Sequence, residues 1–139
     1  MRIVIIGCGR IGAHVARSLA AEGHDVCVVD TEAPSLARLG EAFRGRTVVG
    51  PGFDEAVLLE AEVASADAVA VLTNADATNF MIARAVIELF GVHDVRVRVN
   101  DPEFLALYAE LGVPTVDLPD LVLDGVRQSL APRRDPDRP

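Results

Sequence analysis

The stretch Arg2-Ile3-Val4-Ile5-Ile6-Gly7-Cys8-Gly9-Arg10-Ile11-Gly12 decides the fold, because a short apolar run leads directly into the pattern Gly-x-Gly-x-x-Gly. The apolar run predicts a buried strand over 2–6. Apolar residues at helical spacing follow over 11–21, and they predict a helix that begins inside the glycine pattern. Strand, tight turn and helix in this order are typical of the first unit of a Rossmann-type sheet.

The remainder of the chain continues the alternation of strand and helix. Regular alternation of this kind favours right-handed crossovers between parallel strands. We therefore expect an α/β fold, a Rossmann-type doubly wound parallel sheet with strand order 3-2-1-4-5-6 in a three-layer α/β/α arrangement. Further strands are expected at 25–29, 46–49, 68–72, 95–99 and around Val116, and further helices at 32–43, 54–61, 76–90, 102–111 and 121–130.

The composition excludes several functions. The 139 residues carry a formal net charge of -8, and all 13 basic residues are arginines because the chain has no lysine. A Walker-A phosphate lysine, a Schiff-base lysine and a Tyr-Lys catalytic pair are therefore impossible. The acidic balance also argues against nucleic acid as a partner, since affinity for nucleic acid comes mainly from basic residues.

The apolar segments are too short for a membrane protein. None approaches the roughly 18 residues that a membrane-spanning helix needs, and the N-terminal run reads as a strand rather than a signal peptide. We expect a soluble cytoplasmic protein without direct membrane insertion. In that reducing compartment Cys8 and Cys27 are expected to be small buried residues with no redox role.

The glycine pattern and Asp30 together predict a nucleotide site. Asp30 follows Gly12 by 18 residues, at the end of the second predicted strand. Gly7 permits the tight turn, Gly9 lets the backbone approach a pyrophosphate, and Gly12 lets the helix pack on the strand. Asp30 can accept hydrogen bonds from ribose hydroxyls and would repel a 2′-phosphate, which favours NAD, ATP or ADP over NADP. Alternatively, Asp30 only caps the next helix at Glu32.

The rest of the site is expected at the carboxyl ends of neighbouring strands. Thr31 follows Asp30, and Thr73 and Asn74 follow the fourth strand. Arg98 lies within the fifth strand, where an arginine flanked by valines must reach solvent at the sheet edge or meet an anion. An ion pair between Arg98 and Asp101 is the alternative.

At these positions the sequence resembles the N-terminal nucleotide-binding lobe (TrkA-N) of the Trk and Ktr potassium-uptake regulators, a regulator-of-potassium-conductance (RCK) domain. The resemblance covers residues 1 to about 117. It implies a lobe that binds NAD(H) or ATP/ADP through Gly7, Cys8, Gly9, Arg10, Ile11, Asp30, Thr73, Asn74 and Arg98. Besides the glycine loop it rests on Val28-Val29-Asp30, Ala66-Asp67-Ala68-Val69-Ala70-Val71-Leu72-Thr73-Asn74, Asn79 and Arg96-Val97-Arg98-Val99-Asn100-Asp101-Pro102.

Two positions need separate comment. Arg10 matches an arginine that in some members of the family reaches the terminal phosphate of ATP; the alternative is a solvated side chain in the first helical turn. Where the family usually has Gly-Asp-Ala, this chain has Gly50-Pro51-Gly52-Phe53. An adenine contact by that Asp is lost, and the ring of Phe53 would stack on the base instead.

The expected domains follow from the resemblance. Residues 1–117 form the nucleotide-binding Rossmann lobe, 118–131 a C-terminal helix, and 132–139 a disordered tail rich in Pro, Arg and Asp. Members of the family commonly continue into a smaller lobe that binds a further effector, and this chain stops before it.

The stretch 79–90 of the helix predicted over 76–90 suggests an oligomer. Only Arg84 and Glu88 in it are charged, and they lie four residues apart on one edge. We expect the apolar surface around Phe80, Ile87 and Phe90 to be buried by another copy in a homo-oligomer, a dimer or a higher ring. Alternatively, neighbouring helices of the same domain enclose this helix.

The resemblance implies a regulatory subunit that is not an enzyme. Its partner would be a membrane potassium channel or transporter subunit, which would hold it at the inner face of the plasma membrane. The alternatives are a cofactor domain of an NAD-dependent oxidoreductase whose substrate part lies on another chain, and a passive nucleotide-binding subunit. No catalytic residue and no metal ligand is predicted, because His14, His24, His93 and Tyr108 have no obvious catalytic partner.

Overall fold

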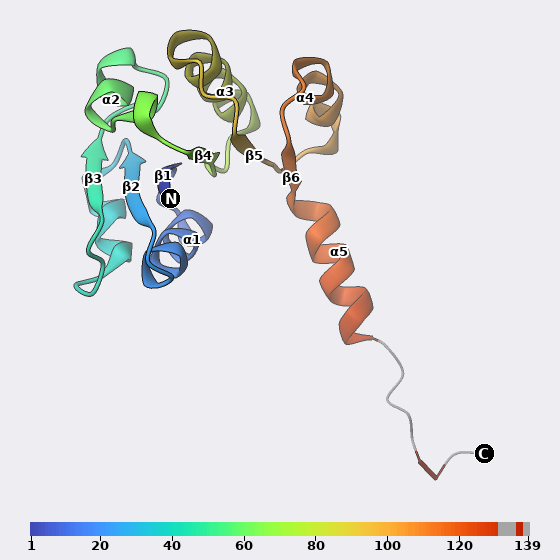
Figure 1. Ribbon diagram of the computed structural model, residues 1–139. Helices are drawn as coiled ribbons and strands as arrows, with labels where there is room; N and C mark the ends of the chain where they lie inside the picture. Colours follow the sequence, from blue (N-terminus) through green and yellow to red (C-terminus); the bar gives the residue numbers. More distant parts are fainter. Residues whose placement is uncertain (131–135, 138–139) are drawn as a thin grey trace.

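Six parallel strands form one sheet at the centre of the computed structural model, which describes residues 1–130 and 136–137. The strand order is β3-β2-β1-β4-β5-β6, which confirms the predicted doubly wound topology (Figure 1). The chain reverses its direction of winding between β1 and β4. The strands are β1 (Arg2–Ile6), β2 (Asp25–Asp30), β3 (Arg46–Val49), β4 (Ala68–Val71), β5 (Val95–Val99) and β6 (Thr115–Asp117).

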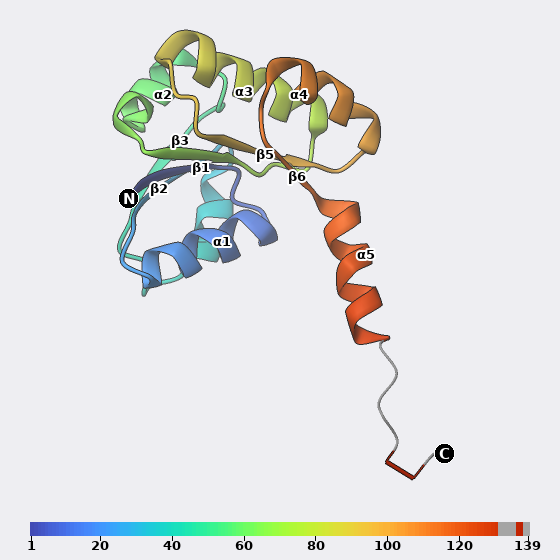
Figure 2. The ribbon, with the colours of Figure 1, turned by 45° about the vertical axis from the view of Figure 1, so that its right-hand side comes forward.

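Helices cover both faces of the sheet (Figure 2). Alternate residues of β1 point to opposite faces, so Ile3 and Ile5 pack in one core and Val4 and Ile6 in the other. One face carries α1 (Arg10–Ala21) and the 3-10 helix η1 (Ala33–Leu39). The other face carries α2 (Glu55–Glu60), η2 (Val63–Ser65), α3 (Asp76–Phe90), η3 (Pro102–Phe104) and α4 (Leu105–Leu111).

The segment predicted as a helix over 32–43 is instead the short 3-10 helix η1. Pro34 lies in its first turn, and Gly40 ends it with a positive φ of 76°. Glycine adopts that conformation without steric cost, so the chain turns away there. The connection between β2 and β3 therefore contains a 3-10 helix of seven residues in place of the predicted helix.

The last helix, α5 (Leu118–Ser129), begins three residues before the predicted start at 121. The carboxylate of Asp117 accepts a hydrogen bond from the N–H of Asp120 at 3.2 Å, and Pro119 occupies the first turn, so both residues favour an earlier start. In Figures 1 and 2 this helix stands away from the sheet, and none of its residues is buried. Its exposed apolar side chains are Leu121, Val122, Leu123 and Val126, and Leu130, directly after the helix, is exposed as well.

The predicted disordered tail, 132–139, lies outside the described residues except for 136 and 137, which are exposed. Within the part of the chain that the structure describes, no helix combines the length and the apolar character needed to cross a bilayer.

The structure supports the alternative interpretation of the surface of α3, that the domain itself covers part of it. Phe80, Ile87 and Phe90 are half-buried against the core of their own domain, and the Phe80 ring meets the Tyr108 ring of α4 edge-on at 5.6 Å. Contact with Tyr108 therefore covers part of the Phe80 side chain. The apolar side chains that α3 does expose are Met81 and Leu89, each 53% exposed.

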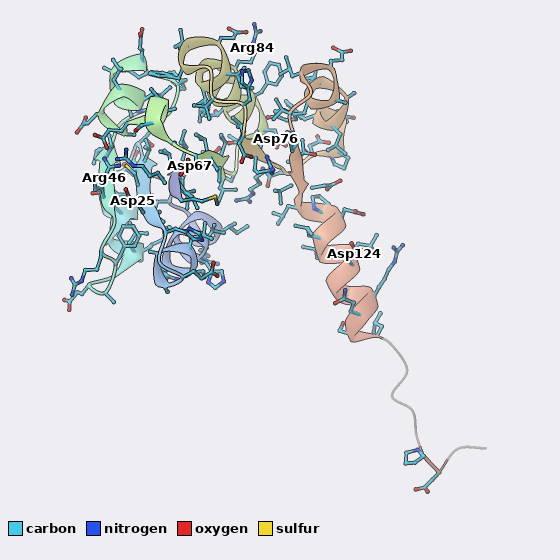
Figure 3. The ribbon with its side chains drawn as sticks, in the orientation of Figure 1. Asp25, Arg46, Asp67, Asp76, Arg84 and Asp124 are labelled. Carbon is cyan, nitrogen blue, oxygen red and sulfur yellow. The ribbon has the colours of Figure 1, made fainter. Side chains whose placement is uncertain are left out.

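Ion pairs gather at the amino end of the sheet, where Figure 3 labels Asp25, Arg46 and Asp67. The Arg2 guanidinium lies 3.2 Å from Asp25 and 2.9 Å from Glu62, and Arg46 also contacts Glu62 at 2.9 Å. The backbone N–H of Arg2 donates to Asp67 at 2.7 Å. The charges at this end of the sheet are thus largely paired with one another.

We predict that Gly12→Ala destabilises the fold. A Cβ at Gly12 would lie 1.8 Å from the carbonyl oxygen of Gly7, so the glycine turn would have to move. The expected loss is about 1–3 kcal/mol of unfolding free energy, the usual range for overpacking. Urea denaturation followed by circular dichroism measures it.

Gly9→Ala is the matched control, because a Cβ at Gly9 meets nothing within 4 Å and its φ of -75° suits alanine. Its unfolding free energy should stay within about 0.5 kcal/mol of wild type. Equal stability of the two variants would contradict the tight packing described at Gly12.

Candidate functional site

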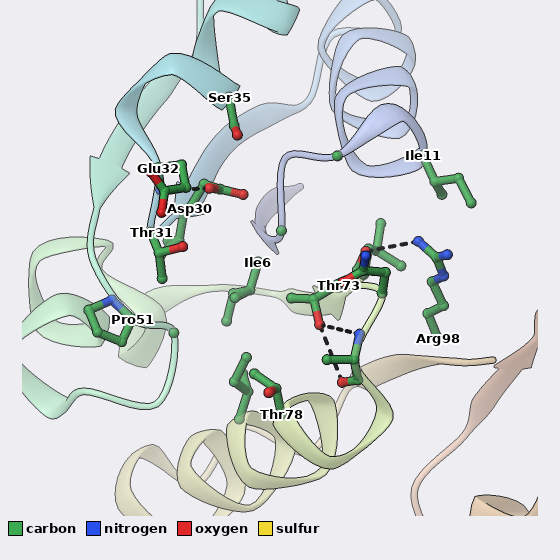
Figure 4. Close-up of a pocket in the computed structure, with 18 of the residues that line it drawn as sticks. Ile6, Ile11, Asp30, Thr31, Glu32, Ser35, Pro51, Thr73, Thr78 and Arg98 are labelled. Atoms are coloured by element: carbon green, nitrogen blue, oxygen red, sulfur yellow. Dashed lines mark hydrogen bonds between the residues drawn. The ribbon is translucent and has the colours of Figure 1, made fainter. Parts of the chain in front are cut away.

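A cavity of about 730 Å³ opens at the carboxyl end of the sheet, at the switch point between β1 and β4 (Figure 4). Parallel α/β sheets bind ligands at this position. Every residue that the sequence predicts for the site lines the cavity, with the exception of Cys8. These residues are Gly7, Gly9, Arg10, Ile11, Asp30, Thr31, Phe53, Thr73, Asn74 and Arg98.

The glycine loop shapes one wall of the cavity. Gly7 has a φ of 109°, and a Cβ there would lie 2.9 Å from the backbone nitrogen of Thr73, so the loops after β1 and β4 approach closely. Gly9 precedes the first turn of α1, and no side chain caps this helix end. The first N–H groups of α1 therefore stay available to an anion, which the helix dipole also favours.

Asp30 is held by two backbone N–H groups. Its Oδ2 accepts from Cys8 at 2.7 Å, and its Oδ1 accepts from Glu32 at 2.8 Å. The capping contact between Asp30 and the N–H of Glu32, which the sequence offered as an alternative, is thus present. The bond from the N–H of Cys8 is additional and joins the glycine loop to the end of β2. A carboxylate has about four acceptor positions, so Asp30, which lines the cavity, can still accept hydrogen bonds from hydroxyl groups of a ligand.

Cys8 belongs to the loop but does not reach the cavity. Its side chain is fully buried, and its thiol donates to the carbonyl of Ser35 at 3.4 Å. Its own carbonyl accepts from the Arg38 guanidinium at 3.2 Å. Burial raises the pKa of this thiol, and Asp30 adds to the rise. Cys8 therefore shapes the loop through its backbone.

Arg98 faces the cavity because of the alternation along β5. Val95, Val97 and Val99 pack in the core beneath α3, which turns Arg96 and Arg98 to the opposite face. There the Arg98 Nε donates to the Asn100 Oδ1 at 2.8 Å, and Nη1 donates to the Leu72 carbonyl at 3.4 Å.

The ion pair of Arg98 with Asp101 does not form. Asp101 instead caps η3 by accepting from the N–H of Glu103 at 3.0 Å. Within residues 1–130 and 136–137, no carboxylate lies within 4.0 Å of the Arg98 guanidinium. Its positive charge is therefore available to an anion in the cavity.

Sequence reasoning missed several residues of the cavity wall. Arg38 reaches the wall from η1, eight residues after Asp30, and Thr78 lies one helical turn after Asn74. Helical spacing from the predicted site residues could have found Thr78. The lining residues that the sequence did not predict include Glu32, Ser35, Arg38, Pro51, Thr78 and Ile82.

The groups weighed as catalytic candidates lie outside the cavity. None of His14, His24 and His93 lines it, and the ring of His24 contacts the N-terminal amine at 3.1 Å. The Tyr108 side chain is fully buried. Burial, with a smaller contribution from Asp76, raises its pKa to about 12. The described residues contain no cluster of three or more His, Cys, Asp or Glu side chains suited to a metal ion.

The sheet order, the glycine turn and the cavity at the switch point define a Rossmann-type α/β domain. The TrkA-N domain family matches residues 3–119, and the chain belongs to this family. One relative is the Trk system potassium uptake protein TrkA of Streptomyces coelicolor, which is 42% identical over 132 residues. That alignment covers 95% of this chain and 59% of the relative, so the chain spans less than two thirds of the relative's length.

Solved structures share the fold. The NAD(P)-binding domain of an exopolyphosphatase-related protein from Archaeoglobus fulgidus superposes with a TM-score of 0.81 at 24% identity, covering 92% of this chain and 96% of that one. The GsuK channel bound to NAD gives a TM-score of 0.72 at 24% identity, covering 84% of this chain and 21% of that one. GsuK bound to ADP gives 0.71 at 24% identity, covering 84% and 31%.

We predict that both thiols are protected in the folded protein. Cys8 and Cys27 are buried, and burial raises the pKa of each, so little thiolate is present at pH 8 and reagents cannot reach it. Both should react with an aromatic disulfide reagent more than about tenfold slower than in denaturant. Single variants Cys8→Ser and Cys27→Ser assign the rates, and labelling of native Cys8 at the denatured rate would contradict its buried place in the loop.

Proposed function

We propose that this chain is the nucleotide-sensing regulatory domain of a membrane potassium channel or transporter, and that it is not an enzyme. The observation that carries the proposal is the arrangement of charge in one cavity. Asp30 lies at one side, the uncapped N-terminus of α1 in the middle, and Arg98, which pairs with no carboxylate of the described residues, at the other side (Figure 4). A volume of about 730 Å³ falls within the range of ligand pockets.

The ligand that fits this arrangement is an adenine nucleotide, NAD(H) or ATP/ADP. Its ribose hydroxyls would donate to Asp30, and its phosphates would accept from the N–H groups of Gly9, Arg10 and Ile11. A 2′-phosphate would meet the negative charge of Asp30, which disfavours NADP. The two states of GsuK named above, with NAD and with ADP, support nucleotides of this class.

The base and the terminal phosphate would lie at opposite ends. Apolar side chains of Ile6, Pro51, Phe53 and Ile82 also line the cavity and would hold the base, with the exposed ring of Phe53 stacking on it. Arg10 also lines the cavity. It would reach a second or third phosphate together with Arg98.

Regulation would follow from assembly. The Streptomyces relative is named a potassium uptake protein, which supports a membrane potassium transporter as partner and a cytoplasmic location beside the membrane. A ligand shifts a conformational equilibrium only through its different affinity for the two states. A nucleotide that draws Arg98 and the glycine loop together would stabilise one arrangement of the subunits, and the membrane partner would respond to it.

The surface supports a homo-oligomer. Val122, Val126 and Leu130 recur every four residues and form one apolar stripe along α5 and its end, all exposed. Met81 and Leu89 on α3 are exposed apolar side chains as well. A helix without a single buried residue gains little from its own domain, so burial against a second copy would stabilise it.

Nucleotide binding should depend on Asp30. We predict that Asp30→Ala weakens ADP and NAD binding by about 1–3 kcal/mol, because hydrogen bonds from the ribose to a charged acceptor are lost. Isothermal titration with NAD⁺, NADH, ATP, ADP and NADP⁺ measures this, with the mass in solution and any turnover recorded for each ligand.

The matched control is Asp25→Ala, at the opposite end of the same strand, which should bind as wild type. Binding that changes the mass without turnover is the expected behaviour of the wild-type chain. Unchanged affinity of Asp30→Ala would remove Asp30 from the site, and nucleotide turnover would overturn the regulatory role.

Assembly should depend on the apolar stripe of α5. We predict that Val126→Glu weakens self-association by about tenfold or more, because a charge would be buried in the contact. Analytical ultracentrifugation over a concentration series measures the dissociation constant. Gln128→Glu adds the same charge off the stripe and should leave it unchanged, whereas equal effects of the two variants would argue against the stripe as an interface.

A further inference from the structure

The guanidinium of Arg98 is held in place by a neutral neighbour. Its Nε donates to the Oδ1 of Asn100 at 2.8 Å, and a weaker contact joins its Nη1 to the Leu72 carbonyl at 3.4 Å. Figure 4 shows the guanidinium beside the loop that carries Thr73, at the side of the cavity away from Asp30. The remaining N–H groups of Arg98 are left for a ligand.

Asn100 is in turn fixed by Asp76, at the start of α3 (Figure 3). The Oδ1 of Asp76 accepts from the backbone N–H of Asn100 at 2.8 Å and from its Nδ2 at 3.3 Å. The Oδ2 of Asp76 accepts from the N–H of Asp101 at 2.8 Å. These bonds orient the amide of Asn100 so that its oxygen, rather than its NH₂ group, faces Arg98.

A different residue holds the backbone of Arg98. The buried side chain of Asn79 donates to the carbonyls of Thr73 at 2.9 Å and Arg98 at 3.0 Å. Asn79 therefore joins the ends of β4 and β5, and Asn100 acts on the Arg98 side chain alone. Loss of Asn100 should free the guanidinium without releasing the strand.

The neutrality of Asn100 has a consequence for binding. An arginine side chain loses rotamer entropy when it is fixed, so fixing it before the ligand arrives favours binding. A carboxylate at position 100 would cancel the charge of Arg98 through an ion pair, and it would repel Asp76, which accepts from the amide of Asn100 at 3.3 Å. An amide oxygen orients the guanidinium and leaves its full charge for an anion.

We propose that Asn100 is a positioning residue that presents Arg98 to the phosphate group of the ligand farthest from the ribose, and that Asp76 fixes Asn100 for this purpose. The proposal rests on the proposed function, since it requires a nucleotide in the cavity. Neither Asn100 nor Asp76 lines the cavity. According to the proposal, both residues contribute to the affinity for the phosphate and not to the affinity for the nucleoside.

A double-mutant cycle with two ligands tests the proposal. Wild type, Asn100→Ala, Arg98→Ala and the double variant are titrated with ADP and with adenosine. Asn100→Ala should weaken ADP binding by about 2- to 10-fold, the range of one hydrogen bond, and leave adenosine binding unchanged. In the Arg98→Ala background it should have no further effect, because its partner is gone.

Asn100→Asp gives a second readout. It keeps the shape of the side chain, adds a charge that offsets that of Arg98, and removes the amide group that donates to Asp76. ADP affinity should therefore fall further than in Asn100→Ala, with adenosine still unaffected. Gln128→Ala, a remote amide, should bind both ligands as wild type. If thermal unfolding shows that one Asn100 variant is unfolded, the titrations of the other decide the question.

The possible failures are distinct. Additive losses in the cycle, or equal losses for ADP and adenosine, would overturn the positioning role of Asn100 while nucleotide binding stands. An Asn100→Asp variant that binds ADP as well as wild type would overturn the argument from charge. A wild-type chain that binds neither ADP nor NAD would overturn the proposed function and this inference with it.

Discussion

The close packing of the turn between β1 and α1 is the constraint on which the rest of the site depends. Only hydrogen atoms at Gly7 and Gly12 let the strand end, the helix start and the loop after β4 approach one another so closely. That approach aims the first N–H groups of α1 at the cavity. The bond from the N–H of Cys8 to Asp30 then fixes the turn to the end of β2, so one small loop orients both a positive helix end and a carboxylate.

The two ends of the sheet differ in how their charges are paired. At the amino end, Arg2 and Arg46 share the carboxylate of Glu62, and such exposed pairs add little to stability. At the carboxyl end, among the residues that the structure describes, the Arg98 guanidinium donates to an amide and a carbonyl and pairs with no carboxylate. An arginine that the fold orients but does not neutralise is suited to binding an anion, and for this reason we propose that Arg98 contacts the ligand's phosphate.

Local sequence patterns predicted the features that depend on neighbours along the chain. Buried strands, the glycine turn and Asp30 at the end of β2 follow from spacing alone, and the strand order follows from the handedness of crossovers. Ten predicted site residues line the cavity because the carboxyl ends of parallel strands meet at one edge of the sheet.

The features that sequence patterns missed depend on contacts between distant segments. Phe80, Ile87 and Phe90 were expected to form an apolar surface, but all three pack partly buried against their own core, and Phe80 contacts Tyr108 of α4. The periodicity of α3 contains no information about these contacts. The sequence also left open whether Arg98 pairs with Asp101. In the structure Arg98 donates to Asn100 instead, and Asn100 is held by Asp76 at the start of α3. Arg38 reaches the cavity from η1, which was expected to be a longer helix.

The central claim is that a nucleotide occupies the cavity between Asp30 and Arg98, and a crystal structure of the chain grown with ADP tests it most directly. The account predicts ribose hydroxyls on the Asp30 carboxylate and phosphate oxygens on the N–H groups of Gly9, Arg10 and Ile11, each at about 2.7–3.2 Å. It also predicts the Arg98 guanidinium, still bonded to Asn100, on the second phosphate. ADP bound elsewhere on the protein, or bound in the cavity with its phosphates away from α1, would contradict the account.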